Sequence, residues 1–176
     1  MIQKKQNMRQ IKINSTTGSE IVSTSDFKDY ARISGSTDDS LIAIILKQAR
    51  IWCENYISRD IVAKNRTYFI DETNGIFDLP FGPIASISSV TIEGVVTTNY
   101  SFIGLDNETI DLDGSAEEVK VTYITNGLDD ELLQQAIKQF ASTLYDNRHD
   151  YVEGKSGDSV PSETKVILNA YKNMFI

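Results

Sequence analysis

Apolar residues recur at three- and four-residue intervals between Asp38 and Ile57, which predicts the main helix of the chain. The stripe contains Ile42, Ile45, Ala49, Trp52, Cys53 and Tyr56, and Leu41, Ile44, Leu46 and Ile51 widen it. We expect Lys47, Gln48, Arg50, Glu54 and Asn55 to face water. A stripe this wide needs partners on more than one side, so we expect the other elements to pack around this helix.

Three further helices are predicted by the same spacing. Ser23 stands three residues before Asp26, an acidic variant of the capping box that opens a short helix from about Thr24 to Arg32. Asp129 to about Asn147 forms a long helix with acids in its first turn. Pro161 suits the first turn of a last helix, whose stripe is Val166, Ile167, Ala170, Tyr171 and Met174.

Between residues 63 and 127 the apolar pattern alternates and is broken by turn residues, which is typical of short strands. The expected strands are Ala63–Asp71, Ile76–Leu79, Ile84–Ile92, Thr97–Ile103, Thr109–Leu112 and Val119–Thr125. The first two are separated by a turn ending at Gly75 and are predicted to pair as a hairpin. A bulge near Ser88–Ser89 would bring the apolar residues of the third into register. These strands predict a small antiparallel sheet, or one curled towards a barrel.

The predicted fold class is therefore α+β, with a helical base of about four helices and an inserted small antiparallel β-sheet lobe. We expect residues 1–22 to form an extended N-terminal arm, in which Arg9–Asn14 could be a short strand. Residues 23–176 would form a single domain. Its parts would be helices (23–62), a β insertion (63–127), a long helix (128–149), a flexible linker (150–160) and a C-terminal helix (161–176).

Charge is distributed unevenly along the 176 residues. The net charge is −8, but residues 1–13 contain Lys4, Lys5, Arg9 and Lys12 and no acid, so they carry +4 and the remainder −12. A body this acidic is unsuited to general nucleic-acid binding, although it could line a passage through which DNA slides. No apolar run is long enough for a membrane span, and we expect no signal peptide. The single cysteine, Cys53, excludes an internal disulfide and fits a reducing compartment.

Residues that could carry chemistry are few. His149 is the only histidine and is expected at a helix end, where a cation suits the helix dipole. Cys53 lies on the apolar stripe and is expected to be a buried hydrophobe. Asp106, Asp111 and Asp113 do not fit the spacing of a calcium loop. Glu117 and Glu118 are adjacent in a strand and so point to opposite faces. We expect no catalytic, cofactor-binding or metal-binding residue, and no enzyme.

Several segments, taken in their order, resemble the head–tail connector (adaptor) proteins of tailed bacteriophages and prophages. They span about residues 20 to 148. Those in the helices are Ser23–Ile33, the main helix from Asp38 to Arg59, Gln135–Ile137 and Tyr145–Arg148. Those in the strands are Leu79–Ile92, with its Leu-Pro and Gly-Pro corner, and Val119–Gly127.

The resemblance implies a structural protein with no cofactor. Such proteins form a homo-oligomeric ring below the portal protein after DNA packaging and dock the tail or a stopper protein, while DNA passes through the lumen. The chain would then lie in the virion, and in the host cytoplasm during assembly, without contacting a membrane. Alternatives are a head-completion stopper or tail-completion protein, a small intracellular hydrolase using His149, and a generic intracellular binding module.

Overall fold

The computed structural model describes residues 8–104, 108–147 and 161–172. Contacts between residues divide the chain into two compact units, and each unit consists of two separate stretches of the sequence. The first contains Val62–Gly127 and the described part of Met1–Gly18. The second contains Ser19–Ile61 and the described part of Leu128–Ile176. The four helices and two antiparallel sheets of the described residues confirm the predicted α+β class.

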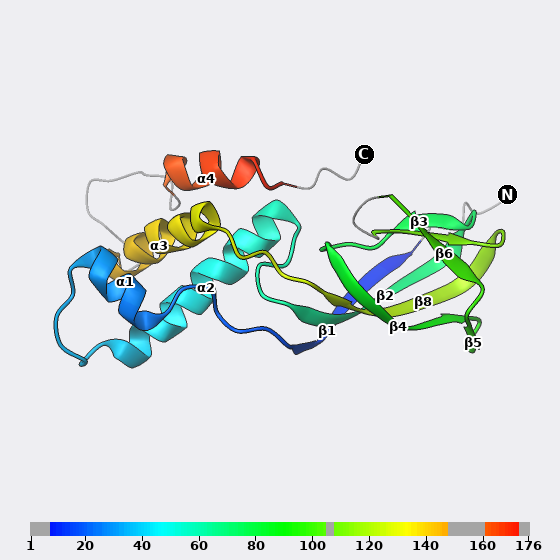
Figure 1. Ribbon diagram of the computed structural model, residues 1–176, viewed down its shortest axis with the longest axis horizontal. Coiled ribbons are helices and arrows are strands. Elements are labelled where there is room, and N and C mark those ends of the chain that lie inside the picture. The colour runs from blue at the N-terminus through cyan, green and yellow to red at the C-terminus, as the bar shows by residue number, and fades with distance from the viewer. Residues whose placement is uncertain (1–7, 105–107, 148–160, 173–176) are drawn as a thin grey trace, which may run out of the picture. The chain divides into compact units, whose positions relative to one another are not determined.

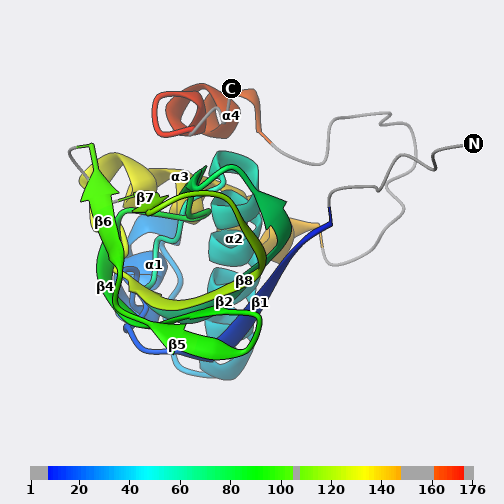
Figure 2. The same ribbon diagram turned by 90° about the vertical axis from the view of Figure 1, so that its right-hand side faces the viewer.

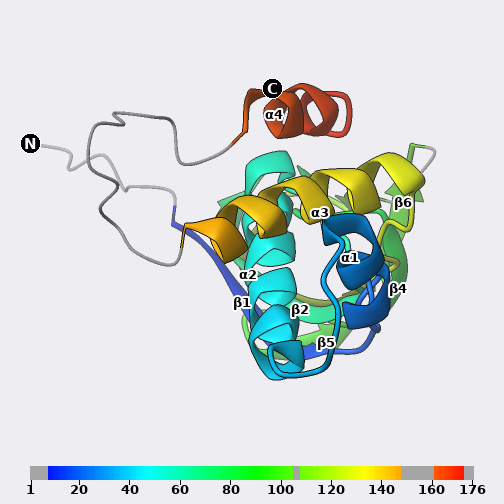
Figure 3. The ribbon, with the colours of Figure 1, turned by 90° about the vertical axis from the view of Figure 1, so that its left-hand side faces the viewer.

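The second unit is built around helix α2 (Asp39–Ile57), as the width of its apolar stripe predicted. The helices that pack on it are α1 (Thr24–Ala31), α3 (Glu131–Asp146) and α4 (Ser162–Asn169), and Figure 3 shows α3 crossing α2 with α1 beside it. The core combines Ile42, Ile45, Ala49 and Cys53 of α2 with a set from its neighbours. That set is Phe27, Leu133, Ala136, Ile137, Phe140 and Leu168.

Local signals in the sequence position the ends of these helices. The Ser23 hydroxyl accepts from the Asp26 N–H at 3.0 Å and the Asp26 carboxylate accepts from the Ser23 N–H at 3.2 Å, so the predicted capping box is present. Asp130 caps α3 by accepting from the Leu132 N–H at 2.8 Å. Helix α4 begins just after Pro161, but its buried residues are Thr164 and Leu168, whereas Val166, assigned to the apolar stripe, is 70 % exposed.

The first unit contains two antiparallel sheets, whose curvature is visible in Figures 1 and 2. The larger sheet has the order β1-β2-β8-β4-β5, with bounds Arg9–Thr16, Lys64–Thr73, Ala116–Thr125, Ile84–Ile92 and Val95–Thr97. The smaller has the order β3-β7-β6, with bounds Ile76–Asp78, Thr109–Leu112 and Tyr100–Ile103. Their shared core includes Tyr68, Ile70, Leu79, Val90, Ile110, Val119, Val121 and Tyr123.

Two details of the strand prediction hold and two are wrong. The register of β4 against β8 shifts between Ile87 and Ser89, close to the predicted bulge, and Arg9–Asn14 does lie within a strand, β1. The predicted hairpin of β2 with Ile76–Leu79 is wrong, because β3 leaves the larger sheet and pairs with β7. The single strand predicted over Thr97–Ile103 is two strands, β5 and β6, which belong to different sheets.

The prediction for the water-facing side of α2 also needs correction. Arg50 and Glu54 were expected to face water, but they are 2 % and 3 % exposed. Ile44 and Ile51, assigned to the buried stripe, are 56 % and 40 % exposed. The physical reason is that Arg50 and Glu54 form an ion pair with each other, described below, which allows both charged side chains to lie on the buried face of α2. Ile44 and Ile51 then lie on the exposed face.

Candidate interaction surfaces

Of the residues considered as candidates for catalysis or metal binding, the structure places Asp113 and Glu117 in the lining of one hollow, described below. His149 and Asp106 lie outside the described residues. Asp113 is exposed and accepts from the Asn99 side-chain amide at 3.3 Å, and Glu117 and Glu118 are exposed on β8. Within the described ranges, no three histidine, cysteine, aspartate or glutamate side chains are grouped so that they could hold a metal ion.

Cys53 is fully buried in the helical core, as predicted. Burial, together with the neighbouring Glu54 charge, raises the pKa of its thiol to about 12. The thiol therefore stays protonated at neutral pH and behaves as a small apolar side chain rather than as a nucleophile.

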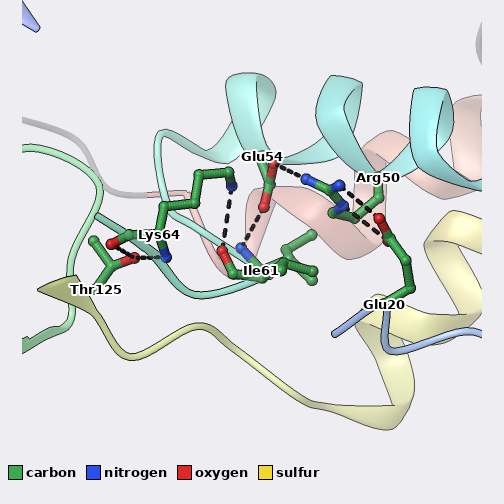
Figure 4. Close-up of polar contacts among 7 residues, drawn as sticks. Glu20, Arg50, Glu54, Ile61, Lys64 and Thr125 are labelled. Atoms are coloured by element: carbon green, nitrogen blue, oxygen red, sulfur yellow. Dashed lines mark hydrogen bonds and ion pairs between the residues drawn. The ribbon is translucent and has the colours of Figure 1, made fainter. Parts of the chain in front are cut away.

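The most elaborate polar arrangement in the described chain is the cluster of Glu20, Arg50 and Glu54, shown in Figure 4. Arg50 donates from Nε and Nη2 to the two carboxylate oxygens of Glu20 at 3.0 and 2.7 Å, and from Nη1 to Glu54 Oε2 at 2.7 Å. The other oxygen of Glu54 accepts from the Ile61 N–H at 3.0 Å. The cluster thus ties the segment before α1 and the segment after α2 to the middle of α2.

Electrostatics favour the charged form of this arginine. Burial alone would lower the pKa of Arg50, but its hydrogen bond to Glu20 and the charges of Glu54 and Glu20 outweigh burial and raise that pKa. A buried arginine is usually accommodated by pairing its guanidinium with carboxylates along the edges that carry its N–H groups, as here. We interpret this cluster as a structural support for the unit rather than as a site of chemistry.

The outer face of the larger sheet carries a groove of about 680 Å³ along strand β1. Its lining consists of Met8, Gln10, Ile11, Lys12, Thr67, Phe69 and Lys120, and we call it the β1 groove. Strand register places Phe69 between Gln10 and Lys120, and Thr67 between Lys12 and Thr122. The groove therefore presents a half-buried aromatic ring between two lysines at the open edge of the sheet.

The opposite edge of the same sheet ends in a tight hairpin. Ile92 pairs with Val95, so only Glu93 and Gly94 form the turn, and both have positive φ, 48° and 80°. Two consecutive left-handed residues are the backbone of a type I′ turn, which suits the twist of a hairpin. Val95 and Val96, which follow it, are 72 % and 67 % exposed. We call Glu93–Val96 the β4–β5 tip.

A second hollow, of about 470 Å³, lies near that tip and is acidic. Glu72, Glu93, Asp113 and Glu117 contribute to its lining, and none of the residues lining it is a lysine or an arginine. Glu72 and Glu117 are direct cross-strand partners, an arrangement that is electrostatically unfavourable for two like charges. The first unit therefore has a basic and apolar surface at one edge of its sheet and an acidic surface towards the other.

The sequence pattern did not reveal the groove, and of the tip it indicated only the turn. Alternation assigns Thr67 and Phe69 to one face of β2, but it does not say which strands lie beside that face. The Glu93–Gly94 turn was recognisable, since glycine after a polar residue is a common turn signal. For the buried cluster, the available signal was the four-residue spacing of Arg50 and Glu54 within an otherwise apolar helix.

Helices of the described chain are too short or too polar to cross a membrane. No protein-family model and no curated protein matches the sequence.

Solved structures that share the fold include three from gene transfer agent (GTA) particles. A chain in the neck of the empty GTA particle, computed with C6 symmetry, is 15 % identical with a TM-score of 0.72, and the match covers 95 % of this chain and 97 % of that one. A chain in the neck of the native particle, computed with C12 symmetry, is 13 % identical with a TM-score of 0.72, and the match covers 95 % of this chain and 97 % of that one. A chain in the virion of the native particle is 13 % identical with a TM-score of 0.69, and the match covers 94 % of this chain and 96 % of that one.

These matches define the class of fold. The chain has, over almost its whole length, the fold of chains found in the neck of a phage-like particle. The particles are those of gene transfer agents, and the likeness is consistent with the resemblance to head–tail connector proteins noted in the sequence.

Proposed function

We propose that the chain is a structural protein of the head–tail neck of a tailed-phage-like particle, where it acts as the connector, or adaptor. The observation that carries this proposal is the similarity of fold to GTA neck chains across 95 % of this chain and 97 % of the other. The connector segments recognised in the sequence come from both units, which supports the same role.

In this role the chain forms a ring below the portal protein and docks the tail or a stopper protein. The neighbouring structures were computed with C6 and C12 symmetry, which is the symmetry expected of rings. DNA would pass through the lumen without sequence-specific binding. The net charge of −12 outside residues 1–13 supports this, because acidic walls repel phosphate. A cryo-EM map with a basic or neutral channel wall would contradict the lumen proposal.

The decisive experiment is deletion of the coding gene in a strain that produces the particles. A connector acts after DNA packaging, so we expect DNA-filled heads without attached tails, and restoration of tails when the gene is supplied in trans. Tailed particles of normal infectivity in the deletion strain would overturn the proposal. Sedimentation of the purified chain with portal protein should show a complex larger than the monomer.

The main alternative is a stopper or tail-completion protein. It predicts the same tailless particles but different contacts. Cross-linking within assembled particles separates the two, because a connector links directly to the portal protein, whereas a stopper or tail-completion protein links to other neck or tail components. The helical second unit supports the connector, since we expect stoppers to be richer in strands.

A further inference from the structure

We propose that the β1 groove of one copy binds the β4–β5 tip of a second copy, so that adjacent subunits join edge to edge through the first unit. The inference rests on the proposed ring and names the surfaces that join its subunits. Both surfaces belong to the same five-stranded sheet, and β1 and β5 are its two edge strands. Open sheet edges are normally covered or blunted, because they readily pair with other chains.

The groove has the chemistry of a docking site for an apolar segment that carries an acid. Met8, just before the edge strand, is 45 % exposed, and the half-buried Phe69 lies between β1 and β8. Ile11 also lines the groove, but it pairs with the buried Tyr68, so its side chain belongs to the other face of the sheet from Phe69. Lys12 and Lys120 flank these apolar side chains. Asp71 shares this face of β2 and lies at the end of the groove, where its N–H donates to the Met8 carbonyl at 3.0 Å, although it does not line the groove. The groove lining itself thus carries two positive charges and no negative one.

The tip has the matching chemistry. Among the described residues of the first unit, Val95 and Val96 are the most exposed large apolar ones, and exposed Glu93 precedes them in the turn, separated from Val95 by Gly94. The two-residue turn holds these side chains on a short, rigid hairpin, so little conformational entropy is lost when the tip docks. Val95 and Val96 are adjacent in β5 and point to opposite faces, so one of them, Val96, would cover Met8 and Phe69. Glu93 would approach Lys12 and Lys120.

The arrangement of the two surfaces determines the kind of assembly. Each copy carries one groove and one tip at different places, so the contact is heterologous, and each subunit binds one neighbour on either side. Such contacts close into a ring when the rotation between subunits allows it. The same charge pattern disfavours groove-to-groove and tip-to-tip contacts, since these would bring like charges together.

A charge exchange between two full-length variants tests the pairing. The groove variant carries Lys12→Glu and Lys120→Glu, and the tip variant carries Glu93→Lys. Each variant alone would bring like charges together, and exposed pairs of this kind should weaken self-association about three- to tenfold. In an equimolar mixture every groove can face a tip of opposite charge. Sedimentation velocity should therefore show association restored in the mixture but in neither variant alone.

A matched control is Lys47→Glu with Lys172→Glu, which changes the net charge equally but lies in the second unit. Mixing this control with the tip variant should give no gain over the control alone. Failure of the groove and tip variants to restore each other's association would overturn the pairing.

Cross-linking tests the contact even where the free chain is mostly monomeric. Gln10→Cys and Val96→Cys variants are mixed and oxidised, with Cys53 buried and unreactive. Held in contact, the two thiols should join at least about tenfold faster than a control pair of Gln48→Cys with Val96→Cys. Equal rates would overturn the proposal, as would faster cross-linking of Gln10→Cys to another neck component. The connector function fails separately, through tailed particles in the gene deletion.

Discussion

The buried cluster of Glu20, Arg50 and Glu54 makes a prediction about stability that can be worked from its geometry. Replacing Glu54 with alanine removes two contacts at once, the 2.7 Å ion pair with Arg50 and the 3.0 Å bond from the Ile61 N–H. Both surviving partners then lie where water has little access, since Arg50 is 2 % exposed. Breaking a buried pair by removing one partner costs about 3–5 kcal/mol.

Glu20 reduces the loss of stability expected for Glu54→Ala, and its own exposure limits the loss expected when Glu20 itself is replaced. Arg50 keeps its two bonds to Glu20 in the Glu54→Ala chain, so we expect a loss of about 3 kcal/mol in the free energy of unfolding, the lower end of the range. Glu54→Gln keeps a hydrogen-bonding side chain of the same shape and should cost about 1–2 kcal/mol. Glu20 has a 40 % exposed side chain, so Glu20→Ala should cost no more than about 1 kcal/mol.

Urea unfolding followed by tryptophan fluorescence is the appropriate assay. Trp52 is the only tryptophan and lies in α2, so its signal reports the unfolding of the second unit. The three variants should rank Glu54→Ala, then Glu54→Gln, then Glu20→Ala, with unchanged dependence on urea concentration. Equal losses below about 1 kcal/mol for Glu54→Ala and Glu20→Ala would refute the reasoning, because Glu54 would then behave as a surface acid.

Three further predictions concern other parts of the fold. The ring of Trp52 packs with its centroid 4.9 Å from that of Phe140, so Trp52→Ala should lower the free energy of unfolding by about 3 kcal/mol, measured by circular dichroism. A loss under about 1 kcal/mol would place Trp52 outside the core. Gly75→Ala should lower the melting temperature more than Gly94→Ala. Both glycines have positive φ, but only at Gly75 would the new Cβ lie 2.7 Å from a backbone oxygen. Equal shifts in melting temperature would contradict this prediction. The hydrogen bond to Asp130 raises the pKa of Tyr171 from 10.0 to about 12. The contribution of this hydrogen bond to stability is therefore complete below pH 10 and is lost as pH rises towards 12. Tyr171→Phe should remove this pH dependence from pH-jump unfolding curves, and an unaltered curve would exclude the contact.

Features that depend on neighbouring residues in the chain could be predicted from the sequence. The Ser23–Asp26 capping box and the bulge near Ser88–Ser89 are examples. In both cases, the residues that determine the geometry lie within a few positions of one another, so a pattern of spacing or of phase is sufficient to reveal them.

Features that depend on distant residues could not be predicted in the same way. Glu20 lies thirty residues from Arg50, and without that partner a charged residue on a helix is best assigned to water. The turn ending at Gly75 favours a local hairpin, yet β3 pairs with β7, more than thirty residues further on. The β1 groove depends on β8 as well as β1 and β2, so no local pattern encodes it.

The hydrogen bond from the Leu128 N–H to the Ile61 carbonyl, 3.0 Å long, has a consequence for the history of such chains. It brings together the two points at which the backbone leaves the second unit for Val62–Gly127 and returns to it. A segment whose ends are one hydrogen bond apart can be gained or lost as a cassette, because a tight turn can replace it without moving the flanking helices. Related chains could therefore differ in this segment, which carries every described strand of the first unit except β1, and still retain the same helical framework.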